Sequence, residues 1–428
     1  MNAFLYRYGS ICEPDILDSF QRIGLTVIEE KTEITEKNIS NARRVQLVEK
    51  GIREHHPLFV FSINFYPAIA EICQIYQTHY FCWTVDSPVP ELFSESIRRS
   101  TNRIFLFDHA QYTQFAPYNP ECIFHLPLAS AVERFDRVIR TISDTDHRQF
   151  TKDITFVGSL YNEKSPLTDL RRAGRLSQRA RGYLDALEES ALKIYGCNFI
   201  EAALADDIVQ EIKASAPLFY DPGKSVAASE TYVAAHSFVG MEVAMKERIL
   251  TLQTLAKYFP VDLYTKSDTA VLFPKASASN SSTVNDRTPG STMEMDHASV
   301  HKPVICENLH VHGGVASLTE MPKLFHLSKI NLNMTIKPIQ EGLPLRIFDI
   351  LGCGGFCMTN YQPELSELFE IGRDLEAYAS LEELVDKCSY YLQHEEVRQK
   401  IAQNGYKKVC ERHTYLHRIK EMLQKATE

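Results

Sequence analysis

The chain has 428 residues, of which 44% are hydrophobic and 24% charged, a composition typical of a folded globular protein. This length exceeds what one ordinary hydrophobic core holds, so we expect two domains. The formal net charge of −9 argues against general nucleic-acid binding, because a surface that binds nucleic acid is usually basic.

The first third of the chain alternates short apolar strands with helices, a pattern typical of a parallel, doubly wound sheet. The predicted strands are Ala3–Tyr8, Leu25–Ile28, Leu58–Asn64, His79–Val85, Arg103–Phe107 and Cys122–Phe124. Three helices are predicted between these strands. The first begins at Pro14 and is closed by Gly24, the second is Ser40–Glu54 with Ser40 as its N-cap, and the third is Ala68–Tyr76. We expect a Rossmann-like domain over residues 1–145, with Asp144–Asp146 in a polar linker.

The remainder predicts a second domain of the same kind over residues 146–412. Its expected strands are Ile154–Val157, Val261–Tyr264, Asn331–Thr335 and Phe356–Thr359. Its expected helices are Arg171–Leu192, Glu242–Tyr258, Thr319–Ser328 (with Thr319 as the N-cap), Leu381–Leu392 and Val397–Cys410. A Ser/Thr-rich stretch at about 275–298 predicts an inserted mobile loop. A last helix near Thr414–Lys425, within residues 413–428, has one apolar face.

The stretch Asn331–Asn360 holds the most informative residues of the chain. It predicts a strand, the loop Lys337–Pro344, the short apolar helix Leu345–Leu351, a tight glycine turn and a second strand. The start of a helix beside a glycine-bearing loop suits an anion, because its N–H groups lack partners within the helix. We therefore expect the N–H groups of Gly342 and Leu343 to bind a diphosphate.

Two acids bracket this loop and the start of its helix. Glu341 and Asp349 are separated by seven residues, so one lies in the loop and the other two turns into the helix. If the loop folds back over the helix start, both carboxylates point toward one ligand. A carboxylate accepts two hydrogen bonds in a plane, which suits the vicinal diol of a sugar ring.

The segment EGLPLRIFDILGCGGFCMT, which contains both acids, resembles the E-x7-E donor site of retaining glycosyltransferases of the GT-B fold (family 4 type), with Asp349 where Glu is usual. Five segments resemble a narrower bacterial group, the CgeB-like (spore maturation protein) glycosyltransferases: FLYRYGSICEPDI, WTVDSPVPEL, ITFVGSLYNEK, TEMPKLFHLSKINLNMT and PLRIFDILGCGGFCMTNYQPEL. Together they sample nearly the whole chain. The resemblance implies two Rossmann-like doubly wound domains facing across a cleft, with the last helix crossing back to the first domain.

Ligands of doubly wound sheets bind at the carboxyl ends of the strands, which selects residues from both domains, His109 among them. A structural histidine is the alternative for His109 and for His125, which also lies at a strand end. In the first domain, Asp86 follows an apolar strand and is expected to contact the acceptor or the transferring sugar; a turn-forming Asp is the alternative. In the second domain, Gly158, Ser159 and Lys164 resemble the G-R-x(n)-K element that meets the donor diphosphate, with Ser159 in place of Arg.

Because Ser159 stands where an arginine is usual, this element lacks one positive charge. Lys337 or Arg346 is expected to supply it, since cationic side chains match phosphate oxygens well. No metal ligand set is expected. His310 and His312 alternate on a predicted strand without a third ligand nearby, and the DTD sequence at Asp144–Asp146 lies in the predicted linker.

These features lead to the hypothesis of a cytoplasmic GT-B glycosyltransferase, since no signal peptide or membrane span is visible. It would move a sugar from a nucleotide-diphosphate-sugar donor to a hydroxyl of a carbohydrate or protein acceptor, with Asp86, Glu341 and Lys337 as catalytic residues. Cationic side chains and a helix N-terminus would stabilise the departing diphosphate without metal or other cofactor. The resemblance implies retention of anomeric configuration and a role in bacterial surface or spore glycosylation. A GT-B nucleotide-sugar epimerase and a non-catalytic sugar-nucleotide-binding protein are the alternatives. The oligomeric state is left open.

Overall fold

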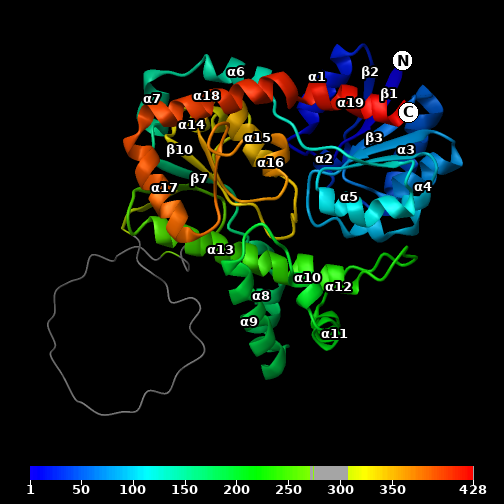
Figure 1. Ribbon diagram of the computed structural model, residues 1–428. Helices are drawn as coiled ribbons and strands as arrows, with labels where there is room; N and C mark the ends of the chain where they lie inside the picture. The colour runs from blue at the N-terminus through cyan, green and yellow to red at the C-terminus, as the bar shows by residue number, and fades with distance from the viewer. Residues whose placement is uncertain (270–272, 274–306, 428) are drawn as a thin grey trace.

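The computed structural model describes residues 1–269, 273 and 307–427, and it contains two parallel sheets of six strands each (Figure 1). The strand orders are β2-β1-β3-β4-β5-β6 and β12-β11-β10-β7-β8-β9. All strand pairs are parallel, and helices flank both sheets. The predicted fold class, α/β with two Rossmann-like doubly wound units, is confirmed. The Ser/Thr-rich stretch at about 275–298 lies outside the described residues.

The N-terminal lobe is the part of the chain built on the first sheet. Its strands are β1 (Asn2–Tyr6), β2 (Thr26–Glu30), β3 (Phe59–Ile63), β4 (His79–Trp83), β5 (Asn102–Leu106) and β6 (Ile123–His125). Its helices include α1 (Glu13–Arg22), α2 (Thr32–Thr35), α3 (Asn41–His55), α4 (Pro67–Ile75) and α5 (His109–Phe115). Every residue of β3 is buried, as expected for a central strand covered on both faces. The predicted N-cap is confirmed, because the Ser40 hydroxyl accepts the Arg43 N–H at 3.2 Å.

The C-terminal lobe is built on the second sheet. Its strands are β7 (Ile154–Val157), β8 (Val261–Tyr264), β9 (Leu309–His312), β10 (Ile330–Asn333), β11 (Cys357–Asn360) and β12 (Glu376–Tyr378). Its helices include α13 (Gly240–Leu255), α14 (Met321–Leu327), α15 (Leu345–Gly352), α16 (Leu365–Leu368), α17 (Leu381–Gln393) and α18 (Glu395–Arg412). The strand–loop–helix–strand unit predicted around residue 345 is therefore β10, α15 and β11.

A group of helices between β7 and α13 projects away from both sheets (Figure 1). It comprises α8 (Pro166–Arg172), α9 (Gln178–Lys193), α10 (Ile200–Ala203), α11 (Asp206–Ser215), α12 (Glu230–Tyr232) and a π-helical segment, Val233–Val239. This insertion also packs on the N-terminal lobe: the Val226 N–H donates to the Phe93 carbonyl at 2.9 Å, and the Phe93 and Tyr232 ring centroids lie 5.0 Å apart. The insertion therefore joins the two lobes below the sheets.

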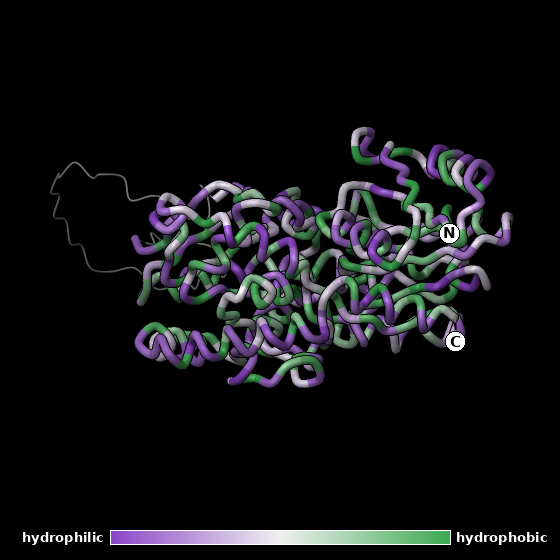
Figure 2. The backbone as a smooth tube through the Cα atoms, turned by 90° about the horizontal axis from the view of Figure 1, so that it is seen from above, coloured by the Kyte–Doolittle hydropathy of each residue, from purple (hydrophilic) through white to green (hydrophobic). Residues whose placement is uncertain are grey.

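The chain crosses between the lobes a second time at its end. The connecting helices α6 (Val132–Ile139) and α7 (Asp144–Phe150) lead into the second sheet, and α19 (Tyr415–Thr427) returns to pack beside α1. The Trp83 and Tyr415 ring centroids lie 6.0 Å apart, and the Arg418 Nε–H donates to the Pro127 carbonyl at 2.8 Å. Both termini consequently lie at the same end of the elongated molecule (Figure 2).

Three local predictions are wrong. The single helix Arg171–Leu192 is two helices, because Gly174 adopts a φ of +65° and the Ser177 hydroxyl caps a new start by accepting the Ala180 N–H. Thr319 is not an N-cap, since α14 begins two residues later. Asp144–Asp146 is not an irregular linker but the first turn of α7, where Ser143 and Asp146 form a capping box.

The described part of the chain contains neither a membrane-spanning helix nor a cluster of metal ligands. Within residues 1–269 and 307–427, no helix has the length and apolar character needed to cross a bilayer. The same residues contain no group of three or more His, Cys, Asp or Glu side chains placed to hold a metal ion. His312 instead bonds Asp262, with Nε2 and Oδ1 2.7 Å apart.

Candidate active site

The loop between β10 and α15 lies against the N-terminal lobe, where one carboxylate binds it. Asp108 follows β5 and accepts the Ala110 N–H at the start of α5. The same carboxylate accepts the N–H groups of Gln340 at 2.8 Å, Glu341 at 3.1 Å and Gly342 at 3.2 Å. Asp108 is fully buried, and this burial raises the pKa of its carboxyl to about 6. Asp108 thus joins the N-terminal lobe by hydrogen bonds to the loop between β10 and α15, which the sequence predicts to bind a diphosphate.

The Gly342 N–H, predicted to face a diphosphate, donates to Asp108 in this conformation. The Leu343 side chain is buried in the core that the two lobes share. A side chain at position 342 has no room, since an added Cβ would lie 2.8 Å from Asp108 Cα. The close approach of the lobes therefore requires glycine at this position.

Replacing Gly342 with alanine should destabilise the protein by about 2 kcal/mol, because the new methyl group pushes against the Asp108 backbone. Gly313 is the matched control: an added Cβ there meets no atom within 4 Å, so Gly313→Ala should stay within about 0.5 kcal/mol of the wild type. Denaturant unfolding of both variants measures the difference. Equal stabilities for the two variants would contradict the close approach.

Glu341 belongs to a cluster of two glutamates and two histidines, Glu341, Glu364, His109 and His125, at the same contact between the lobes. Its Oε2 lies 3.0 Å from His109 Nδ1, and its carbonyl accepts the Glu364 N–H at 3.3 Å. The Glu364 carboxylate in turn accepts the His109 N–H at 2.6 Å and lies 3.4 Å from His125 Nε2. His109 is one of the residues that the sequence selects at a strand end, whereas Asp108 and Glu364 were missed. Asp108 follows a strand as Asp86 does, which is the signal that could have found it.

Asp349, the second acid of the pair, is buried on α15 beside cationic side chains. Its Oδ2 lies 3.2 Å from Arg346 Nη1. Burial raises the pKa of the Asp349 carboxyl to about 6, although the charges of Arg346 and Arg134 act in the opposite direction. Arg134 itself donates to Asp15 of α1 at 2.8 and 2.9 Å. Asp349 therefore faces the N-terminal lobe, on the side of α1 and α6.

Asp86 follows β4 on the N-terminal lobe. Its Oδ2 accepts the side-chain amide of Asn64 at 2.7 Å and lies 3.5 Å from the Tyr8 hydroxyl. Burial raises the pKa of the intervening Cys12 thiol to about 12, and the charges of Asp349 and Asp86 add to the effect. The charges of Asp86 and Asp349 thus both act on the Cys12 thiol. Glu341 instead contacts His109.

The predicted diphosphate element at Gly158 folds around a buried arginine. The Ser159 hydroxyl donates to Glu163 at 2.6 Å and accepts the Tyr161 N–H, while Lys164 is exposed, with its ammonium 5.6 Å from the Tyr161 ring centroid. Arg248 of α13 lies behind this turn and donates to the Ser159 and Met334 carbonyls. Burial, and to a smaller extent the charge of Arg346, lowers the pKa of Arg248. This cation, missed in the sequence, lies where the replaced arginine was expected to act.

Lys337 points toward the helical insertion. Its ammonium donates to the Ile194 carbonyl at 2.8 Å and lies 5.0 Å from the Tyr195 ring centroid. The buried Glu247 carboxylate is 4.0 Å away. These contacts of Lys337 therefore include neither Glu341 nor Asp349, and Arg346 is the predicted cation that contacts Asp349.

Comparisons with known proteins bear on the fold and on the C-terminal part of the chain. A protein-family model described as "Glycosyl transferase-like" matches residues 289–424. HepE from Anabaena, in complex with UDP and glucose, aligns over 100% of this chain and 99% of its own, with a TM-score of 0.52 and 12% identity. A glycosyltransferase from Rickettsia africae aligns over 100% and 97% (TM-score 0.55, 8% identity), and sucrose-phosphate synthase from Thermosynechococcus elongatus over 99% and 98% (0.53, 8%). A search of curated protein sequences found no significant match.

The structural neighbours establish the GT-B fold, and the family match identifies the C-terminal part of the chain as glycosyl transferase-like. The predicted class of enzyme, a glycosyltransferase, is confirmed by this match. The CgeB-like group and the role in spore maturation stay predictions.

Proposed function

We propose that the protein transfers a sugar from a nucleotide-diphosphate-sugar to an acceptor hydroxyl, with the donor bound by the C-terminal lobe. The observation that carries the proposal is the loop and helix from Glu341 to Asp349. This segment follows the carboxyl end of β10, faces the N-terminal lobe and places Arg346 beside Asp349. A neighbour of the same fold, HepE, was crystallised with UDP-glucose, which makes this the first donor to test.

Each group of the site has a role in this proposal. The Asp349 carboxylate accepts hydrogen bonds from the ribose diol, while Arg346 and Lys164, with Arg248 behind the Gly158 turn, supply positive charge for the diphosphate. Glu341 and Asp86 contact the transferring sugar and the acceptor. The site needs no metal if these cations stabilise the leaving group.

The transfer exchanges one bond to the anomeric carbon for another. A bond forms from the acceptor oxygen to the anomeric carbon, and the bond from that carbon to the diphosphate oxygen breaks. The acceptor proton leaves with the diphosphate, whose negative charge the cations and the N-terminus of α15 stabilise. Retention of anomeric configuration is part of the proposal and rests on the E-x7-E resemblance.

Calorimetric titration with UDP-glucose, with and without Mg²⁺, tests this proposal. The wild type should bind without metal, and Glu341→Ala and Asp349→Ala should each abolish measurable binding. Asp386→Ala is the matched control, because Asp386 is an exposed carboxylate on α17, remote from this segment in the sequence. Wild-type affinity in both site variants would refute the assignment of these residues.

A second candidate is a nucleotide-sugar epimerase, which needs both carboxylates and histidine at the reacting sugar. The His109–Glu341 pair favours this candidate specifically. Proton NMR of UDP-N-acetylglucosamine incubated with the protein alone separates the two functions. An epimerase yields a new sugar without acceptor, whereas a transferase leaves the donor unchanged or releases UDP by slow hydrolysis.

A further inference from the structure

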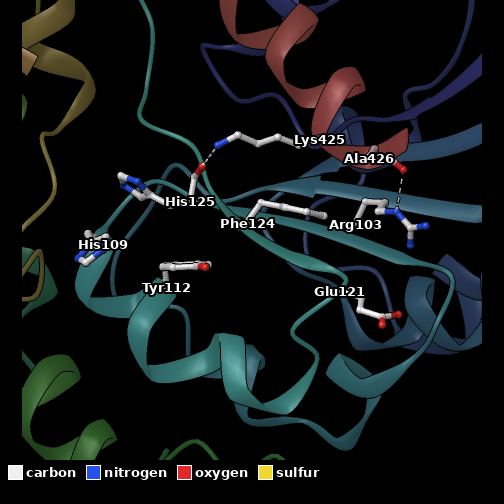
Figure 3. Close-up of a pocket in the computed structure, with 8 residues that line it drawn as sticks. All are labelled: Arg103, His109, Tyr112, Glu121, Phe124, His125, Lys425 and Ala426. Carbon is white, nitrogen blue, oxygen red and sulfur yellow. Dashed lines mark hydrogen bonds between the residues drawn. The ribbon is translucent and has the colours of Figure 1, made fainter. Parts of the chain in front are cut away.

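A pocket of about 710 Å³ opens at the edge of the first sheet, between α5, β6 and α19 (Figure 3). This volume lies within the range of small-molecule binding sites, roughly 300–1,000 Å³. Its lining consists of Arg103, His109, Tyr112, Glu121, Phe124, His125, Lys425 and Ala426. The two histidines lie at one end of the pocket, and Arg103 and Glu121 lie at the other.

The histidine end of the pocket offers polar groups to a ligand. The His109 side chain is 46% exposed, with its Nδ1 3.0 Å from Glu341 Oε2, and the His125 Nε2 lies 3.4 Å from Glu364 Oε1. An imidazole ring has two nitrogens, each of which can donate or accept a hydrogen bond according to the tautomer. A ligand with hydroxyl groups at this end of the pocket would therefore find a hydrogen-bonding partner in His109.

The middle of the pocket has aromatic walls. The ring centroid of Tyr112 lies 5.9 Å from that of His109 and 6.2 Å from that of His125. Phe124 of β6 lines the same pocket. Aromatic side chains combine an apolar face with polar groups at the edge, which suits a ring that carries both C–H faces and hydroxyl groups. This part of the pocket therefore favours a sugar ring.

The charges around the pocket are mixed. Lys425 donates to the His125 carbonyl at 2.9 Å and Arg103 to the Ala426 carbonyl at 3.2 Å, so both cations already have partners. Glu121 adds a negative charge at the outer end. These charges disfavour a phosphorylated ligand, because it would need cations free to bind it.

We infer that this pocket binds a neutral saccharide, the acceptor of the transfer. This inference rests on the proposed function. His109 lines the pocket and its Nδ1 lies 3.0 Å from Glu341 Oε2, so the histidine end adjoins the donor loop. An acceptor sugar that fills the pocket therefore presents a hydroxyl to His109 and Glu341, with the rest of the saccharide directed toward Arg103.

Saturation-transfer NMR of the full chain tests the pocket, with maltose, cellobiose, lactose and chitobiose as probes in the presence of UDP. At least one disaccharide should bind, and Tyr112→Ala should weaken that binding at least tenfold, while Tyr112→Phe should retain it within threefold. Tyr258→Ala is the control, because Tyr258 is exposed and lies just after α13. Phe124→Leu provides a second pocket variant if Tyr112→Ala does not fold.

The outcomes separate the pocket from the proposed function. Binding of no disaccharide, or equal binding by Tyr112→Ala and Tyr258→Ala, overturns the inference. Tyr112→Ala should leave the Kd for UDP-glucose unchanged, and a tenfold loss of donor affinity in this variant would overturn the separation of the two sites. If UDP-glucose does not bind but a disaccharide binds in a Tyr112-dependent manner, the saccharide pocket stands and the transferase proposal fails.

Discussion

Replacing Asp108 with alanine should lower the free energy of unfolding by about 3 kcal/mol, one of the largest effects expected for a single substitution in this chain. The variant removes the acceptor for four backbone N–H groups, three of them in the loop that carries Glu341. Because Asp108 is fully buried, water does not replace the lost carboxylate without rearrangement. Denaturant unfolding followed by circular dichroism measures the loss.

Hydrogen exchange of residues 337–345 distinguishes this mechanism from general destabilisation. The Gln340, Glu341 and Gly342 amides should exchange faster in Asp108→Ala than in the wild type, since their acceptor is gone. Asp386→Ala, on the exposed surface of α17, should change neither stability nor this exchange. Unchanged protection of the loop in Asp108→Ala would show that another group holds it.

The two sheets could be predicted because each strand has a recognisable pattern within its own few residues. Strands covered on both faces appear as short continuous apolar runs, and FVFSI of β3 and ITFV of β7 are of this kind. The unit from β10 to β11 was equally clear, since its glycines and Pro344 mark the ends of its elements. Local pattern therefore determined the fold class.

The contact between the lobes could not be predicted in the same way. Asp108 binds residues more than 230 positions further along the chain, and no periodicity connects the two segments. Arg248 was missed for a related reason. The charged run Glu242–Arg248 indicates a solvated helix face, but in α13 these side chains are buried and paired with distant groups such as Glu188 and Ser159.

The affinity for UDP-glucose should fall about tenfold when the pH is lowered from 7.5 to 5, because Asp349 must be ionised to accept both hydroxyls of a diol. Burial raises the pKa of its carboxyl from the usual 3.8 to about 6, so at pH 5 most molecules carry the neutral acid. By the same shift, the folded state holds this proton more tightly than the unfolded chain. The neutral Asp349 carboxyl therefore stabilises the folded state at low pH, and this contribution to the free energy of unfolding is lost as the pH rises from about 4 to about 6.

The assignment of this titration to Asp349 depends on the variant Asp349→Asn. Its amide has a single acceptor oxygen, so it should bind UDP-glucose at least tenfold more weakly at pH 7.5, with little further loss at pH 5. UDP-glucose is a suitable ligand because both of its phosphates are esterified and lack the second ionisation near pH 6 of a terminal phosphate. Asp386→Asn should reproduce the wild-type curve. A slope that persists in Asp349→Asn would assign the titration to another group, and Asp108, with its pKa also near 6, is the residue that the structure offers.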